Sequence, residues 1–261
     1  MKIWTVDAFT DLPFAGNPAA VTIVDDFPTD ARCLQIAAEM NLSETAFLKP
    51  LSEDHFNIRW FTPKVEVKLC GHATLASSHI LFEEDLIKSE TVTFESLSGP
   101  LHVRKEEKNI ILDFPLQKTG ESLPSTHFEK LFPAEFIVNA VTANDDVIVE
   151  LRDEDIVRNL TLDPSVVMSV DHRGLIVTAK GAQPFDFVSR VFEPHEGINE
   201  DPVTGSAHCK LADYWQQKLD KSEFLAYQAS SRGGVLGVTI VGDRVHLKGQ
   251  AVTMLKGTLR I

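Results

Sequence analysis

Apolar and polar residues alternate with the period of a β-strand in many short segments of the chain. The clearest case is His55–Phe61, where Phe56, Ile58 and Trp60 occupy every second position. Further strands are predicted over Lys2–Phe9, Ala20–Val24, Thr91–Glu95, Leu101–Lys105, Asn109–Phe114, Asp146–Leu151, Leu175–Ala179, Phe185–Phe192, Glu223–Ala229, Gly234–Val241 and Arg244–Leu247. The pattern therefore predicts a strand-rich protein.

Helical spacing of apolar residues is confined to a few segments. Thr29 or Asp30 can cap a helix that ends near Asn41. Three more helices are predicted, one after Gly71, one over Asp153–Leu160 and one after Gly205. Small residues follow both glycines, which favours central, buried positions for those two helices.

The order of these elements repeats along the chain. The motif R-x-F-x-P begins at Arg59 and again at Arg190, an offset of 131 residues. Gly71 and Gly205 open similar helices at an offset of 134 residues, and another glycine lies 28 residues after each. Three markers with nearly one offset predict two similar lobes.

The division between the lobes is expected in Gln117–Glu135, a polar segment with one glycine and two prolines. We therefore predict an N-terminal lobe over residues 1–118 and a C-terminal lobe over 119–261. The expected fold is α+β, with two pseudo-symmetric α/β lobes, each a mixed sheet around a central helix. Clefts between domains are common small-molecule sites, so we expect the active site there.

Composition narrows the class of protein. An apolar fraction of 43% in 261 residues allows a substantial core, and a net charge of −13 argues against nucleic acid as a partner. No apolar run reaches the roughly 18 residues of a membrane span. The first residues read as a strand and not as a signal peptide, and the three cysteines are sparse and odd in number. These features favour a cytoplasmic protein with reduced thiols.

The starts of the two glycine-led helices are candidate anion sites, because the first N–H groups of a helix have no partner within it. Cys70 and His72 flank the first start, while Asp201, Thr204 and Ser206 flank the second. Asp201 could instead cap its turn, His72 could bond a backbone carbonyl, and Cys70 could be a small core residue.

Glu44 passes from a helix into a strand among apolar neighbours. A carboxyl group in such surroundings is suited to general acid/base catalysis, although a solvated turn residue is the alternative.

Several common sites are missing from the sequence. There is no H-E-x-x-H, C-x-x-C, Walker A or G-x-S-x-G motif, and no feature marks a lysine for pyridoxal phosphate. His195, Glu200 and His208 match no familiar metal-site spacing. We expect neither a metal nor a cofactor.

Four motifs occur in order along the chain, namely Val6-Asp-Ala-Phe-Thr with Pro13-Phe-Ala-Gly-Asn-Pro18, Asn41-Leu-Ser-Glu44-Thr-Ala-Phe, Cys70-Gly-His72-Ala-Thr, and Glu200-Asp201-Pro-Val-Thr-Gly-Ser-Ala-His208. On these motifs the whole chain resembles the PhzF-like (phenazine biosynthesis) family. The resemblance implies a diaminopimelate-epimerase-like fold, cofactor-independent chemistry and a homodimer. It also implies proton transfer of the kind by which the type member isomerises a hydroxylated dihydroanthranilate.

The resemblance assigns roles to particular residues. It implies that Glu44, His72 and Asp201 are catalytic. Substrate-binding positions are expected at Gly71, Gly205 and Ser206, together with the adjoining Ser43 and Thr204.

The sequence thus predicts an isomerase that moves a proton on carbon of a small carboxylic acid, with neither nucleic acid nor membrane as a partner. One alternative is a thiol-dependent epimerase or racemase that uses Cys70, although the matching second position is Thr204. The others are a non-catalytic carboxylate-binding protein and a structural or interaction protein.

Overall fold

The computed structural model describes all 261 residues and divides them into two units. The first lobe comprises residues 1–114 and 248–261, and the second comprises 115–247. This corrects the expected boundary at 118/119, because the last strand returns to the first lobe. That strand, β17 (Ala251–Thr258), pairs antiparallel with β1 (Lys2–Ala8) from Lys2↔Thr258 to Ala8↔Ala251.

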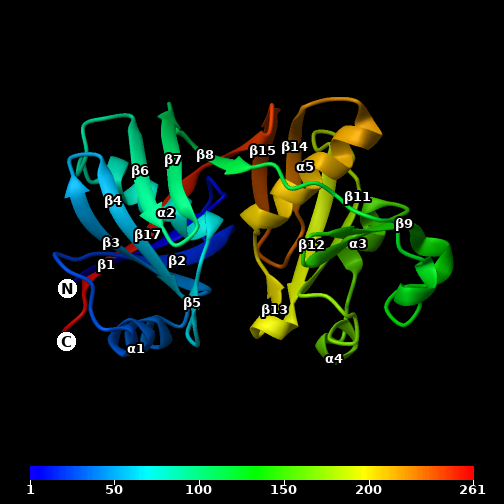
Figure 1. Cartoon of the computed structure of the whole chain (residues 1–261), viewed down its shortest axis with the longest axis horizontal. Helices are drawn as coiled ribbons and strands as arrows, with labels where there is room; N and C mark the ends of the chain where they lie inside the picture. Colours follow the sequence, from blue (N-terminus) through cyan, green and yellow to red (C-terminus); the bar gives the residue numbers. More distant parts are fainter. The chain divides into compact units, whose positions relative to one another are not determined.

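The first lobe contains a mixed sheet with the strand order β17–β1–β2–β3–β4–β6–β7–β8 (Figure 1). Its other strands are β2 (Asn17–Ile23), β3 (Glu44–Ser52), β4 (His55–Phe61), β6 (Thr91–Ser96), β7 (Gly99–Glu106) and β8 (Asn109–Pro115), and the short β5 (Glu66–Val67) also pairs with β4. The pairs β2/β3 and β4/β6 are parallel and the others are antiparallel.

The central helix of the first lobe is α2 (Gly71–Glu83), which packs against β1, β2, β3 and β17. Its small side chains allow close approach, and its buried hydroxyls bond to the helix itself: Ser77 donates to the carbonyl of Ala73 and Ser78 to that of Thr74. The predicted burial of this helix is confirmed. The outer helix α1 (Asp30–Met40) is capped by Thr29, one of the two predicted caps, and it ends at Asn41 as predicted.

The second lobe has the strand order β9–β10–β11–β12–β14–β15. Its strands are β9 (Ile137–Ala143), β10 (Asp146–Leu151), β11 (Gly174–Lys180), β12 (Phe187–Glu193), β14 (Glu223–Gln228), β15 (Gly234–Val241) and β16 (Arg244–Gly249), and β13 (Ile198–Asp201) pairs with β12. Its helices are α3 (Glu154–Asn159), α4 (Pro164–Val167), α5 (Gly205–Leu219) and the 3-10 turns η1 (Ser125–Phe128), η2 (Ala134–Phe136) and η3 (Pro194–Glu196).

The predicted repeat is confirmed in the strand pairing. In each lobe the consecutive pairs are antiparallel, parallel, antiparallel, parallel and antiparallel. Phe61 pairs with Thr45, and its counterpart Phe192 pairs with Leu175, so the register makes Gly174 the counterpart of Glu44.

The segment that was expected to be a linker, Gln117–Glu135, belongs instead to the second lobe. Phe128 and Phe132 are each 1% exposed and pack in the core with Val147 and Val177. Burial of two phenylalanines ties this proline-containing segment to the lobe. The strands β5, β9, β13 and β17 and the helix α4 were not predicted. None of the helices has the length and apolar composition that crossing a membrane requires.

Helix α5 is anchored by aromatic packing. Phe187 stacks on Trp215 at 5.7 Å and on His208 at 6.0 Å, measured between ring centroids. His208 Nδ1 donates to the carbonyl of Thr204 at 2.8 Å, and its Nε2 has no hydrogen-bond partner. Burial lowers the pKa of His208 to about 4.

This buried histidine predicts a loss of stability in acid. The folded protein keeps His208 neutral down to about pH 4, whereas the unfolded chain takes up a proton near 6.5. The free energy of unfolding should therefore fall by about 3 kcal/mol from this group between pH 7 and pH 4. Denaturant unfolding of His208→Gln should show a correspondingly smaller acid loss. The exposed His195→Gln serves as the control, and equal acid losses in all three proteins would contradict the assignment.

Candidate active site

Three side chains of the first lobe meet where β3 and α2 begin. Glu44 is the first residue of β3, Cys70 immediately precedes α2, and His72 is the second residue of that helix. His72 Nε2 lies 3.1 Å from Glu44 Oε2, and Cys70 Sγ lies 3.5 Å from His72 Nδ1. All three residues are buried. The structure thus brings together Glu44 and His72, and it excludes the solvated-turn alternative for Glu44.

The other side of the imidazole faces a polar pair. The Asn17 amide lies 3.1 Å from His72 Nδ1, and Ser43 Oγ donates to Asn17 Oδ1 at 3.1 Å. An amide can present its nitrogen or, rotated, its oxygen, and a serine hydroxyl can donate or accept. Asn17 and Ser43 can therefore form hydrogen bonds that suit either a neutral or a protonated His72. Ser43, which was expected to bind substrate, here supports Asn17.

Burial and the neighbouring side chains act in opposite directions on His72. Burial alone would lower the pKa of its imidazole, but Cys70 and Glu44 raise it well above the usual value of 6.5. Burial, followed by the charge of Glu44, raises the pKa of the Cys70 thiol to about 11. At neutral pH Cys70 is thus a thiol.

Glu44, Cys70 and His72 also offer three potential metal ligands whose atoms lie within 4.8 Å of one another. Both nitrogens of His72, however, already face protein partners, Asn17 at Nδ1 and Glu44 at Nε2. A metal ion would have to displace one of them.

The corresponding turn in the second lobe is held by buried hydrogen bonds. Thr204 Oγ1 donates to Asp201 Oδ2 at 2.5 Å. Gln228 accepts from the backbone N–H of Thr204 at 2.8 Å and donates to the carbonyl of Asp201 at 2.7 Å. Asp201 therefore braces the turn and does not cap α5. Like α2, α5 begins without a side-chain cap, and Gly205 and Ser206 are its first residues.

The counterparts of the first-lobe groups carry different chemistry. Cys70 and His72 correspond to Thr204 and Ser206, each flanking the glycine that begins its helix. Glu44 corresponds to Gly174, where an added Cβ would meet Asp146 Oδ1 at 2.9 Å. The second lobe thus has neither an acid nor an imidazole at these positions.

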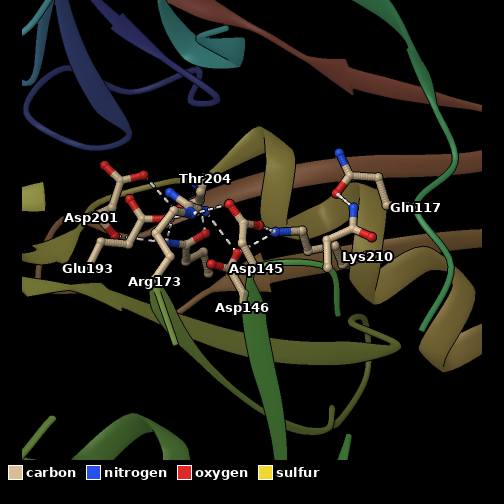
Figure 2. Close-up of polar contacts among 10 residues, drawn as sticks. Gln117, Asp145, Asp146, Arg173, Glu193, Asp201, Thr204 and Lys210 are labelled. Atoms are coloured by element: carbon tan, nitrogen blue, oxygen red, sulfur yellow. Dashed lines mark hydrogen bonds and ion pairs between the residues drawn. The ribbon is translucent and has the colours of Figure 1, made fainter. Parts of the chain in front are cut away.

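An ionic network around the buried side chains of Lys210 and Asp146 occupies the second lobe instead, as Figure 2 shows. Lys210, on α5, lies 2.5 Å from Asp146 and 3.1 Å from Asp145. Arg173 contacts the same two aspartates at 2.8 and 3.0 Å and Glu193 at 3.1 Å. The network fastens α5 to the ends of three strands.

Glu200, which with His195 and His208 matched no familiar metal-site spacing, has both carboxylate oxygens bonded to Arg190. Asn17 was not predicted as a site residue, although it lies in the motif Pro13-Phe-Ala-Gly-Asn-Pro18. The turn-rich sequence around it does not indicate that it contacts His72.

The fold is similar to that of a probable proline racemase from Agrobacterium radiobacter K84, with a TM-score of 0.64 at 10% identity, covering 100% of this chain and 93% of that one. The model of the family described as phenazine biosynthesis-like protein matches residues 6–257. The chain therefore belongs to the PhzC–PhzF family.

Relatives agree with this membership. An uncharacterised isomerase of Halalkalibacterium halodurans is 48% identical over 266 residues, covering 98% of this chain and 97% of that protein. A human phenazine biosynthesis-like domain-containing protein is 40% identical over 286 residues, with 99% of each covered. A PhzF-family crystal structure from Enterococcus faecalis is 41% identical, with a TM-score of 0.92 and coverage of 100% and 99%.

The contact between Glu44 and His72 predicts an unusual titration. His72 should remain protonated well above pH 6.5, and Glu44→Gln should lower its pKa because the stabilising anion is lost. The measurement is a pH titration of the imidazole signals by NMR. Glu83→Gln, which alters the neighbouring pair of Glu83 with His79, is the matched control. An unchanged His72 titration in Glu44→Gln would contradict the assignment.

Proposed function

We propose that this protein is a cofactor-independent isomerase that moves a proton between carbon atoms of a small carboxylic acid, with Glu44 as the general acid/base. The buried contact of Glu44 with His72, 3.1 Å long at the uncapped start of α2, carries the proposal. Curated relatives named isomerases, from Halalkalibacterium halodurans and Pseudomonas aeruginosa, support the same reaction class.

The proposed reaction begins with the Glu44 carboxylate removing a proton from a substrate carbon. The electron pair of that C–H bond moves into the adjoining conjugated system, and negative charge develops on the substrate. The His72 imidazolium stabilises this charge, as do the first N–H groups of α2 at Gly71. Glu44 then returns the proton to another carbon, so the bonds shift while the atoms of the substrate are conserved.

The second lobe is proposed to supply binding groups. Gly205 and Ser206 begin α5 without a side-chain cap, an arrangement suited to a carboxylate. Asp201 and Thr204 are already bonded to each other, so they would act as a fixed pair. That these groups act on the same substrate as Glu44, in the cleft expected between the lobes, stays a prediction, as does the homodimer.

The difference between the lobes supports a single acid/base group. An epimerase with two bases needs one on each face of the substrate. Here the counterpart of Glu44 is Gly174, and the counterpart of Cys70 is Thr204, whose hydroxyl is bonded to Asp201. One carboxyl group that both removes and returns the proton favours isomerisation over inversion at one carbon.

The proposal predicts proton exchange at carbon. Wild-type protein in D₂O, incubated with amino acids, hydroxy acids and dihydroaromatic acids, should introduce deuterium at a C–H position detectable by NMR. Glu44→Gln should slow this exchange by about 10²–10⁴-fold, the usual contribution of general acid/base catalysis.

Glu83→Gln, which changes an exposed carboxyl group at the end of α2 without a role in the proposal, should retain wild-type exchange. Full exchange by Glu44→Gln would overturn the assignment of the base. Saturable binding of a carboxylic acid without exchange in any protein would instead support the non-catalytic carboxylate-binding alternative.

The thiol alternative is tested separately. Because the pKa of Cys70 is raised to about 11, iodoacetamide should alkylate it slowly at pH 7.5. Cys70→Ala should retain exchange within about tenfold, since only a hydrogen-bonding neighbour of His72 is lost. Loss of exchange in both Cys70→Ala and Cys70→Ser, with the fold retained by circular dichroism, would favour a thiol mechanism.

A further inference from the structure

The repeated R-x-F-x-P motif is not used by the proposed reaction, yet in both lobes its arginine makes a bidentate contact with a glutamate and lies over the phenylalanine of the motif. In each lobe the arginine lies on a strand that pairs with a short strand leading to a glycine-started helix. We name these two contacts the Arg59–Glu66 clamp and the Arg190–Glu200 clamp.

The Arg59–Glu66 clamp is bidentate. Arg59 Nε donates to Glu66 Oε1 and Nη2 to Oε2, both at 2.7 Å. Nη2 also donates to Asp30 at 2.8 Å, and the guanidinium lies over the Phe61 ring at 5.0 Å. One side chain therefore joins β4, β5 and the start of α1.

The Arg190–Glu200 clamp repeats this geometry. Arg190 Nε donates to Glu200 Oε1 at 2.7 Å and Nη2 to Oε2 at 2.9 Å. The guanidinium lies over the Phe192 ring at 5.2 Å, and Nη1 donates to carbonyls at the end of α3, those of Val157 and Leu160. A bidentate pair fixes orientation as well as distance.

The clamped strands have little backbone pairing of their own. Strand β5 makes two residue pairs with β4. Strand β13 pairs with β12 at Val191↔Asp201 and Glu193↔Ile198, with an irregular register between them. So short a ladder holds its strand weakly, and the clamp adds two charge-assisted hydrogen bonds to it.

Successive side chains of a strand point to opposite faces, so a clamp on Glu200 fixes the direction in which the adjacent Asp201 points. We propose that the Arg190–Glu200 clamp positions Asp201 and the start of α5, and that the Arg59–Glu66 clamp does the same for Cys70 and the start of α2. The inference rests on the proposed function, because only that function makes Asp201 and the starts of α2 and α5 parts of an active site.

The test compares isosteric variants of the clamp with a matched surface pair. Glu200→Gln keeps the size of the side chain and weakens the bidentate contact. Arg190→Lys keeps the positive charge but cannot make a bidentate contact. Glu106→Gln alters an Arg–Glu contact at the surface, where Arg104 Nε lies 2.9 Å from Glu106. Each full-length protein is labelled with ¹³C at the aspartate carboxyl carbon, and the Asp201 signal is identified by its loss in Asp201→Asn.

The expected result is a displaced or broadened Asp201 carboxyl signal in Glu200→Gln and Arg190→Lys, and an unchanged signal in Glu106→Gln. Once a substrate is known, kcat should fall by about 10–100-fold in both clamp variants with little change in KM, as for other supporting contacts of a site. In the first lobe, Glu66→Gln should move the His72 imidazole signals and leave Asp201 unchanged.

An Asp201 signal that stays in place in both folded clamp variants would overturn the proposal, as would clamp variants that alter the signals of both lobes equally. Because the NMR signals need no substrate, failure to find carbon-acid exchange would count against the proposed function alone. Displaced signals with an unchanged kcat would show that the positioning has no catalytic consequence, which also contradicts the proposal.

Discussion

The chemistry proposed for the first lobe depends on one buried contact, that between the carboxyl group of Glu44 and the imidazole of His72. Taking a carboxylate out of water costs several kcal/mol, so a buried carboxylate needs a partner that recovers this free energy. The parallel pairing of β2 with β3 provides the partner, because it starts β3 beside the first turn of α2. Both side chains are thereby buried, and Glu44, together with Cys70, raises the pKa of His72 against the effect of burial.

The two lobes share a fold, but their charged side chains are paired differently. In the second lobe Lys210 and Arg173 pair with Asp145 and Asp146, so the charges hold one another and stabilise α5. In the first lobe the remaining side of His72 faces neutral Asn17, which can support either protonation state. The first lobe is thus suited to the proposed proton transfer, and the second lobe is suited to holding groups in place.

Local patterns predicted much of the fold, because strand alternation, caps and the repeat all lie within short stretches of sequence. What they could not predict were features set by distant partners. The return of β17 to β1 and the burial of Phe128 and Phe132 depend on long-range packing that no local period records. At the site, the approach of Glu44 to His72 was expected only from the family resemblance, and the contacts of Asn17 were missed, because both depend on how strands pair.

The two clamps are partly buried ion pairs, whose value lies in orientation more than in stability. Desolvation of an arginine and a glutamate offsets most of their attraction, so apolar side chains could fill the same space at similar free energy. Apolar packing has no direction, however, and β5 and β13 have too few backbone pairs to define their own orientation. The bidentate contact of Arg59 or Arg190 fixes the orientation of the strand. The clamped glutamate directly precedes Asp201 in one lobe and lies four residues before Cys70 in the other, so a rotated strand would misplace these groups.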